Sequence, residues 1–372
     1  MTAQVQGDLL RSSMVFPASS LAATLRAMKA ECALVINDSG VLVGMVTDGD
    51  IRRAFLSGAS LDTPIDQVMT RDPIRVGITA TNEDVLRIMV ARKIRQVPVV
   101  DADGRPVALE LFKDRLDDDG VAEAVVMAGG RGQRLMPLTQ DTPKPLLKVG
   151  DQTILDDILG KLRRNGVKDV VLTVGYLADK IRDHIGAGES HDLHVNYVQE
   201  ETALGTAGAL ALLDPRPQHA FLVMNGDLLT ELDFRALSTF HQESGNAITM
   251  CVRRFSYRIP YGVVRLENDS HSVAGIDEKP EIPFLVNAGI YMVNPAVIDL
   301  IPKGRFYDMV SLMNQARSLD QKVGAFPILE YWKDIGQHAE IAEADLYCRA
   351  KLAAAAMSAA VYPFPIPHGG QP

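Results

Sequence analysis

A strand-like apolar run that opens directly onto three closely spaced glycines constrains this chain most. Residues 124–127 read Ala-Val-Val-Met, and glycines follow at positions 129, 130 and 132. The short apolar run predicts a buried parallel strand. Glycine lets the backbone turn sharply, and bare N–H groups after a strand form a natural phosphate cradle. The sequence therefore predicts a phosphate-binding loop, with positive charge nearby from Arg131, Arg134 and Lys144.

The loop differs from the two commonest phosphate-binding motifs. It lacks the Lys-Ser/Thr pair that closes a P-loop, and its glycines do not have the Gly-x-Gly-x-x-Gly spacing of dinucleotide sites. Three glycines alone could equally form an ordinary turn between a strand and a helix. The longer string is more specific, because Ala-Gly-Gly-x-Gly-x-Arg-Leu is followed by Pro-Leu-Thr and Pro-Lys-Pro-Leu. This string resembles the signature of the sugar-1-phosphate nucleotidyltransferases.

The resemblance implies a role for each part of the loop. The family wraps its glycine loop around a nucleoside triphosphate, so Arg134 and Lys144 are expected to hold the phosphates and the leaving pyrophosphate. The expected loop contacts are Ala128, Gly129, Gly130 and Gly132.

Two aspartates in matching contexts indicate a metal site. Asp227 ends an apolar strand and follows Gly226, and Asp334 lies in a string that resembles the family's Trp-x-Asp-Ile-Gly. Mg²⁺ prefers oxygen ligands and keeps several waters, so one or two carboxylates suffice. Read alone, Asp227 could be a turn residue, but the pair together favours Mg²⁺ binding.

Residues 200–210 follow a predicted strand and resemble the segment that contacts the base, with Glu200, Gly205 and Thr206 as its expected contacts. Uridylyl- and thymidylyltransferases typically have glutamine where this chain has Glu200. An ionised carboxylate only accepts hydrogen bonds, and guanine offers two adjacent donors. The sequence therefore favours GTP. The alternative is that Glu200 is a solvated charge at a strand end.

The acceptor sugar phosphate has its own expected contacts. Gly262 lies in a string that resembles the sugar-contacting loop, and Glu278 and Lys279 match the family's Glu-Lys-Pro. The resemblance implies that Glu278 holds a sugar hydroxyl, that Lys279 holds the sugar phosphate as a catalytic cation, and that Asn287 belongs to the far wall. A Glu-Lys pair by itself is usually part of a solvated face.

The N-terminal part contains a repeat of about sixty residues, each copy predicting a helix, two strands and a helix start. It resembles a tandem pair of cystathionine-β-synthase (CBS) domains, which usually bind adenine nucleotides and regulate an attached enzyme. The resemblance places a regulatory nucleotide at Thr47 and Asp50. In the second repeat Asp114 is retained, but Leu111 stands at the threonine position. The alternative is a purely structural pair, in which Asp50 caps its own helix.

These motifs divide the chain into a regulatory CBS pair (residues 1–116), an α/β nucleotidyltransferase domain with a Rossmann-like mixed or parallel sheet (121–345) and a C-terminal helix with a flexible tail (346–372). The formal net charge of −9 argues against a nucleic-acid partner. No apolar run is long enough for a membrane helix, and no signal peptide is visible. Cys32, Cys251 and Cys348 read as free thiols of a cytoplasmic protein, and a homo-oligomer is expected.

The predicted reaction joins a nucleoside triphosphate, preferably GTP, to a sugar 1-phosphate and releases pyrophosphate. The resemblance implies direct attack of the acceptor phosphate oxygen on the α-phosphorus, which fits the absence of a Ser-His or Cys-His arrangement. The combined features resemble the glucosamine-1-phosphate guanylyltransferases of legionaminic acid biosynthesis. The alternatives are a mannose- or heptose-1-phosphate guanylyltransferase and, from another class, a non-catalytic nucleotide sensor.

Overall fold

The computed structural model describes residues 13–28, 32–92, 94–111, 121–267 and 271–360, with side chains up to Lys351. Contacts within the chain divide it into two compact units, Met1–Asp117 and Asp118–Pro372. Asp114 and residues 117–120, between the two predicted domains, lie outside the described residues. None of the helices in the described ranges is long and apolar enough to cross a membrane.

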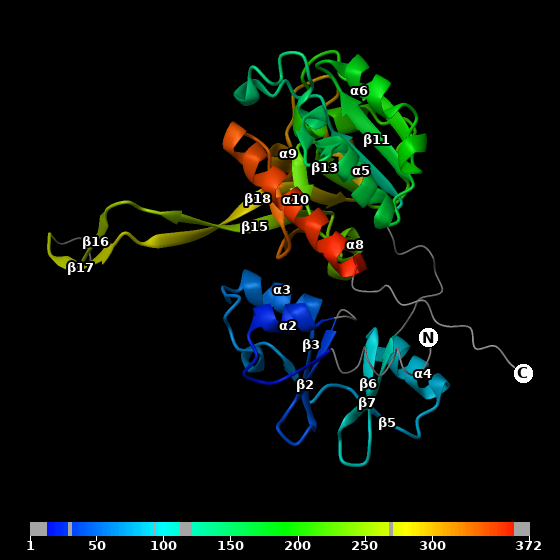
Figure 1. Ribbon diagram of the computed structural model, residues 1–372, viewed down its shortest axis with the longest axis vertical. Helices are drawn as coiled ribbons and strands as arrows, with labels where there is room; N and C mark the ends of the chain where they lie inside the picture. Colours follow the sequence, from blue (N-terminus) through cyan, green and yellow to red (C-terminus); the bar gives the residue numbers. More distant parts are fainter. Residues whose placement is uncertain (1–12, 29–31, 93, 112–120, 268–270, 361–372) are drawn as a thin grey trace, which may run out of the picture. The chain divides into compact units, whose positions relative to one another are not determined.

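The first unit contains two small sheets (Figure 1). One has the strand order β1 (Met14–Val15), β2 (Cys32–Ile36), β3 (Leu42–Thr47) and β4 (Thr70–Arg71), and the other β5 (Val76–Gly77), β6 (Gln96–Val100) and β7 (Pro106–Leu111). The helices are α2 (Leu21–Ala27), α3 (Asp48–Leu56) and α4 (Asn82–Arg92). A helix followed by an antiparallel strand pair occurs twice, as α2-β2-β3 and α4-β6-β7, in agreement with the predicted repeat.

The second unit is built on a seven-stranded mixed sheet. Its strand order is β12 (His194–Gln199), β11 (Asp169–Val174), β8 (Glu123–Met127), β13 (Phe221–Asn225), β18 (Glu281–Val293), β15 (Ile248–Arg258) and β19 (Val323–Pro327). The first four strands are parallel, whereas β18 runs antiparallel to both β13 and β15. The mixed, largely parallel sheet is as predicted.

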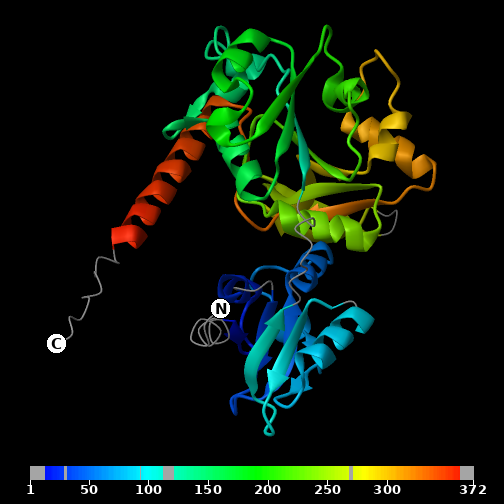
Figure 2. The ribbon, with the colours of Figure 1, turned by 90° about the vertical axis from the view of Figure 1, so that its right-hand side faces the viewer.

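Helices cover both faces of this sheet, because the central strand β8 is apolar on both sides. Ala124 and Val126 pack into one core with α5 (Ile154–Arg164), α6 (Ala178–Ile185) and α8 (Phe234–Ser244). Val125, from the opposite face of the strand, packs into a second core with α9 (Met309–Ser318). Figures 1 and 2 show α5 and α6 on one side of the sheet and α9 on the other.

Local sequence signals set the ends of α5. Thr153 and Asp156 form a reciprocal capping box at its start. After Asn165 the chain leaves the helix through Gly166, whose φ of +95° favours glycine.

The C-terminal helix α10 (His338–Ala360) begins eight residues before the predicted C-terminal segment, residues 346–372. It packs on the second unit, since Tyr347 stacks on Tyr331 at 3.5 Å and the Asp345 carboxylate accepts a hydrogen bond from the Gly150 N–H. The predicted tail, residues 361–372, lies outside the described residues.

Smaller elements complete this unit. They are β9 (Lys148–Val149) paired with β10 (Gln152–Thr153), β14 (Leu228–Thr230) paired with β20 (Trp332–Asp334), and the short helix α7 (Gly205–Gly208).

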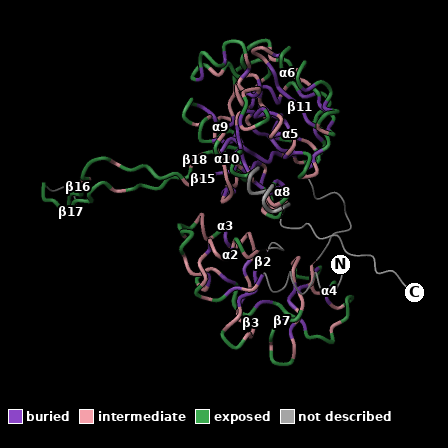
Figure 3. The backbone as a smooth tube through the Cα atoms, in the orientation of Figure 1, coloured by how far each residue is buried: buried purple, intermediate pink, exposed green. Residues whose placement is uncertain are grey.

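Strands β15 and β18 continue well beyond the sheet as a two-stranded ribbon, extended by β16 (Gly262–Leu266) and β17 (Val273–Glu278) (Figure 1). Figure 3 shows the ribbon exposed along nearly its whole length. The predicted sugar-contacting loop at Gly262 is therefore a strand of this ribbon.

Candidate active site

The glycine loop starts where β8 ends, and one buried threonine holds its turn. The Ala128 N–H donates to the Thr173 carbonyl (2.8 Å), which keeps the loop start beside β11. Gly132 then adopts a left-handed conformation with φ +60°. The hydroxyl of Thr139, which is fully buried, donates to the Gly132 carbonyl (2.9 Å). A Cβ at Gly132 would lie 2.9 Å from Thr139 Cγ2 and 3.2 Å from Lys144 Cβ, so both backbone angle and space require glycine.

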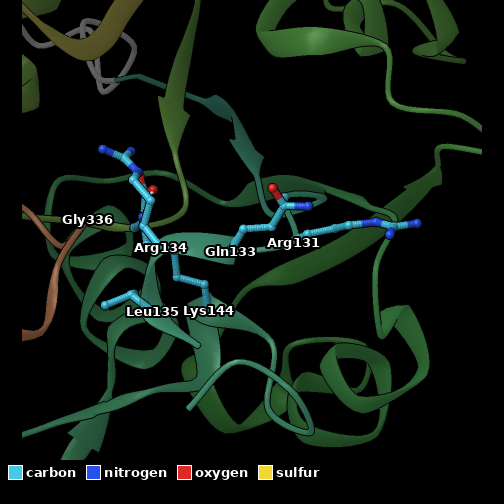
Figure 4. A pocket seen from close by; sticks show the side chains of 9 residues that line it. Arg131, Gln133, Arg134, Leu135, Lys144 and Gly336 are labelled. Carbon is cyan, nitrogen blue, oxygen red and sulfur yellow. Dashed lines mark hydrogen bonds and ion pairs between the residues drawn. The ribbon is translucent and has the colours of Figure 1, made fainter. Parts of the chain in front are cut away.

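A pocket of about 370 Å³ opens against this loop (Figure 4). Its lining is Gly130, Arg131, Gly132, Gln133, Arg134, Leu135, Lys144, Asp227 and Gly336. The glycine loop and three cationic side chains therefore line one space, which suits a phosphate chain.

Lys144 connects the two predicted metal ligands. It lies in a short 3-10 helix (Lys144–Leu146) after Pro143, and its ammonium makes an ion pair with Asp227 Oδ2. The same Nζ is 4.0 Å from Asp334 Oδ1. The β14–β20 pairing places Leu228 opposite Asp334, and the Ile335 N–H donates to the Asp227 carbonyl (3.0 Å). Asp227 and Asp334, which are 107 positions apart in the sequence, therefore both lie beside Lys144.

The carboxylates of this cluster fit a hydrated divalent cation. Asp227 Oδ1 is buried and has no hydrogen-bond partner among the described residues. Burial raises the pKa of Asp334, and the negative charge of Asp227 raises it further. Two like charges this close favour a shared cation. No group of three acidic, His or Cys side chains with metal-binding geometry occurs in the described part of the chain, and Mg²⁺ needs only one or two carboxylates besides water.

Glu200 lies directly against the glycine loop. It follows β12, and its Oε2 accepts a hydrogen bond from the Leu204 N–H (3.0 Å). A Cβ added to Gly129 would be only 2.5 Å from Oε1, so the bare face of Gly129 makes room for this carboxylate. The other two predicted base contacts, Gly205 and Thr206, contact neighbouring backbone groups of the protein. Gly205 has φ +78° and lies against the Tyr307 carbonyl, and Thr206 Oγ1 accepts from the Met309 N–H (3.0 Å).

The predicted sugar contacts do not reach the pocket. Gly262, Glu278 and Lys279 lie on the ribbon, because the β15–β18 ladder carries them away from the sheet. Asn287 lies in β18, where its Nδ2 donates to the Tyr291 hydroxyl (2.7 Å) and its Oδ1 accepts from the Gly289 N–H (2.9 Å). The structure therefore brings five predicted residues together around the loop: Arg134, Lys144, Asp227, Asp334 and Glu200. The predicted sugar contacts lie away from this group.

Several supporting residues escaped the sequence analysis. The Tyr176 hydroxyl donates to the Gln140 carbonyl (2.8 Å), and the Arg131 guanidinium lies 5.8 Å from the Tyr176 ring centroid. Glu340 accepts from the N–H groups of Gly336 (2.6 Å) and Gln337 (2.7 Å), which fixes the wall beside Arg134. Tyr176 follows the end of a parallel strand, a position that could have marked it, whereas Glu340 carried no such signal.

The predicted regulatory residues form a helix cap. Thr47 N–H and hydroxyl both donate to Asp50 Oδ2, at 2.9 and 2.7 Å, and Arg53 makes an ion pair with Oδ1. Both carboxylate oxygens of Asp50 are therefore occupied, and a ribose bound there would displace Arg53.

The Gly132→Ala variant tests the loop geometry. The positive φ and the close Thr139 contact should lower the free energy of unfolding by about 1–2 kcal/mol. The matched control is Gly130→Ala, where an added Cβ meets nothing within 4 Å and φ is not positive. Denaturant unfolding of both variants measures the difference. An equal loss in the two would contradict a specific requirement at Gly132.

Known proteins resemble this chain in both units. A model described as "Nucleotidyl transferase" matches residues 123–350, and a CBS domain model matches residues 8–57 and 65–109. A mannose-1-phosphate guanylyltransferase of Mycobacterium tuberculosis is 31% identical over 218 residues, and the β catalytic subunit of that enzyme from Danio rerio is 32% identical over 225 residues. Each match covers 58% of this chain and 61% of the relative, so the chain spans about three fifths of these relatives' length.

A solved structure shows the same fold. That solved chain comes from Bacillus anthracis and is assigned as a glucose-1-phosphate thymidylyltransferase. It superposes on the present chain with a TM-score of 0.50 at 24% sequence identity. The match covers 61% of this chain and 95% of that one. Because the nucleotidyl transferase model spans more than half of the residues, this chain belongs to the nucleotidyl transferase family, and a pair of CBS domains precedes the family domain.

Proposed function

We propose that this chain is a sugar-1-phosphate nucleotidyltransferase, which converts a nucleoside triphosphate and a sugar 1-phosphate into a nucleoside-diphosphate sugar and pyrophosphate. The observation that carries the proposal is the single pocket that joins the glycine loop, Arg134, Lys144 and Asp227, with Asp334 beside Lys144. The names of the relatives agree with this reaction.

The chemistry follows from positioning and charge. An oxygen of the sugar 1-phosphate attacks the α-phosphorus, and the bond to the β-phosphate oxygen breaks as pyrophosphate leaves. The loop N–H groups orient the triphosphate, while Arg134 and Lys144 offset the negative charge that grows on the leaving group. The family generally uses a divalent metal, and Asp227 and Asp334 would hold Mg²⁺ here, which supplies further charge neutralisation when bound.

The proposed nucleotide is GTP. The Leu204 N–H occupies one acceptor position of Glu200, and a carboxylate has about four, so two guanine donors can still be met. Uracil and thymine would instead turn carbonyl oxygens towards this carboxylate. The two guanylyltransferases among the relatives support the same base.

The sugar is proposed to be a hexose or heptose 1-phosphate. The names of the relatives favour mannose 1-phosphate, and the domain combination resembles glucosamine-1-phosphate guanylyltransferases; heptose 1-phosphate is the remaining candidate. Pyrophosphate release from each nucleoside triphosphate with each sugar 1-phosphate identifies the pair. Tight nucleotide binding without pyrophosphate release from any pair would support the non-catalytic sensor.

The CBS pair is proposed to bind one regulatory nucleotide, at Thr47 and Asp50. Leu111, the last described residue of β7, offers no hydroxyl at the matching place of the second repeat. A nucleotide there changes turnover only if it binds two conformations of the chain with different affinity.

Asp227→Asn and Asp334→Asn should each lower turnover by at least about 10²-fold, because an amide binds a divalent cation more weakly than a carboxylate. Asp151→Asn, at an exposed position, is the matched control. Pyrophosphate release at saturating Mg²⁺ measures the effect. Parent-like turnover in either variant would contradict the assigned metal site.

Glu200→Gln should weaken the use of GTP and relax discrimination against UTP. A glutamine amide leaves one guanine donor badly paired, which costs about 1–3 kcal/mol. The ratio of kcat/KM for GTP and UTP is the measurement, and Glu201→Gln, the exposed neighbour, is the control. An unchanged ratio in Glu200→Gln would show that Glu200 does not read the base.

Asp50→Ala should remove nucleotide binding at the CBS pair. Asp84→Ala is a matched control, since Asp84 caps α4 through Thr81 with the same hydrogen bonds that Asp50 makes with Thr47. Calorimetric titration of each full-length variant with AMP, ADP and GDP compares the nucleotide binding of Asp50→Ala with that of Asp84→Ala. An equal loss in both variants, or no binding by the parent chain, would favour a purely structural pair.

A further inference from the structure

Tyr176 contacts the segment of the glycine loop at three places. Its N–H donates to the Gly129 carbonyl (3.3 Å), and its hydroxyl donates to the Gln140 carbonyl (2.8 Å). Between these two points, the guanidinium carbon of Arg131 lies 5.8 Å from the centroid of the Tyr176 ring. One residue therefore holds the chain before and after Arg131, and also the side chain of Arg131 itself.

The backbone fixes Tyr176 at this place. A Cβ added to the preceding Gly175 would lie 3.1 Å from the Gly129 carbonyl oxygen, so the turns that follow β8 and β11 touch each other. Leu177 then has a φ of +53°, which is uncommon for leucine, and α6 begins at the next residue. Tyr176 is half-buried between these turns, so its ring has a defined place beside the loop.

Arg131 is the pocket cation whose charge no carboxylate of the described chain offsets. Lys144 makes an ion pair with Asp227, and the positive charge of Arg134 interacts with Asp334. Arg131 makes no ion pair with any of the residues that the structure describes. An aromatic ring attracts a guanidinium but does not neutralise it, so the charge and the N–H donors of Arg131 stay available to a ligand.

A triphosphate bound against the loop supplies the anion that Arg131 lacks. A planar guanidinium presents parallel N–H donors that match the oxygens of a phosphate group. Figure 4 shows Arg131 and Arg134 pointing away from each other, so the two side chains reach different parts of a phosphate chain. The signature Ala-Gly-Gly-x-Gly-x-Arg-Leu leaves the position of Arg131 open, so this cation is a feature of the present chain.

We propose that Tyr176 is a positioning residue, which holds Arg131 beside the pocket as a third phosphate-binding cation. Arg131 contacts the nucleotide, and the Tyr176 ring acts only through Arg131. Because the ring restrains the guanidinium before the nucleotide arrives, less side-chain freedom is lost on binding. The inference rests on the proposed nucleotidyl transfer, which supplies the nucleoside triphosphate.

Arg131→Ala should raise the KM for GTP at least about tenfold, because a hydrogen bond between charged groups is lost. The KM for the sugar 1-phosphate that gives the highest turnover with GTP should stay within about threefold. Arg182→Ala is the matched control, since Arg182 lies 5.2 Å from the ring centroid of Tyr197 but does not line the pocket. Pyrophosphate release measures all three chains, and thermal unfolding confirms that the variants are folded.

A comparison of GTP with UTP separates a phosphate contact from a base contact. Both nucleotides carry the same triphosphate, so Arg131→Ala should lower kcat/KM for GTP and for UTP by the same factor. The ratio of the two values should therefore stay as in the parent chain, unlike the ratio in Glu200→Gln. A changed ratio in Arg131→Ala would assign Arg131 to the base and overturn the proposal.

The role of the ring is tested by two variants of Tyr176. Tyr176→Leu removes the ring and should raise the KM for GTP about two- to fivefold, the range of an exposed cation–π contact. Tyr176→Phe retains the ring and should stay within about twofold of the parent. In the Arg131→Ala background, Tyr176→Leu should raise the KM no further, because the ring acts through Arg131. Additive effects of the two changes would overturn the positioning role.

The failure of this inference differs from the failure of the proposed reaction. An active parent chain whose KM for GTP is unchanged by Arg131→Ala would overturn the inference and leave the reaction intact. A parent chain that releases no pyrophosphate would contradict the reaction, and calorimetric titration of the parent and Arg131→Ala with GTP then decides the role of Arg131. Equal dissociation constants, or no binding of GTP to the parent, would overturn the inference in that case.

Discussion

The second unit depends on one constraint, the burial of β8 on both faces. Ala124 and Val126 pack against α5 and its neighbours, while Val125 packs towards α9, and β11 and β13 complete its hydrogen bonds on either side. A strand enclosed in this way cannot shift by one residue without exchanging its two faces. The glycine loop starts from the end of this fixed strand, so its position relative to β12 and β13 is set by the core.

The ion pair of Lys144 with Asp227 connects that loop to the far end of the chain. Asp227 follows β13, Lys144 follows the loop, and Asp334 arrives on β20 through its pairing with β14. An unpaired buried carboxylate is costly, and two adjacent ones are more so. The ammonium of Lys144 offsets this charge within the chain itself, and the same concentration of negative charge is what a divalent cation requires.

The ribbon follows a different physical rule from the rest of the unit. Its inner strands continue the hydrogen bonds of the central sheet, but the ribbon side chains that are exposed among the described residues, such as Tyr257 and Phe284, belong to neither of the two cores. The residues that resemble sugar contacts, Glu278 and Lys279, lie on this exposed part. Packing of the ribbon and placement of these side chains are therefore linked.

The sequence by itself determined the local elements. Apolar runs predicted β8 and β13, and glycine positions predicted the loop, because these depend on neighbours a few residues apart. The loop string also predicted Arg134 and Lys144, and the Gly-Asp pair at the end of a later strand predicted Asp227; the structure gathers all three in one pocket. Only the tertiary structure decided that β18 runs antiparallel, that Glu340 fixes the Gly336 wall and that Glu278 lies away from the pocket. Each of these features depends on contacts between segments that are distant in the sequence. The free energy of such contacts is shared among many residues, so no single position in the sequence carries a signal for it.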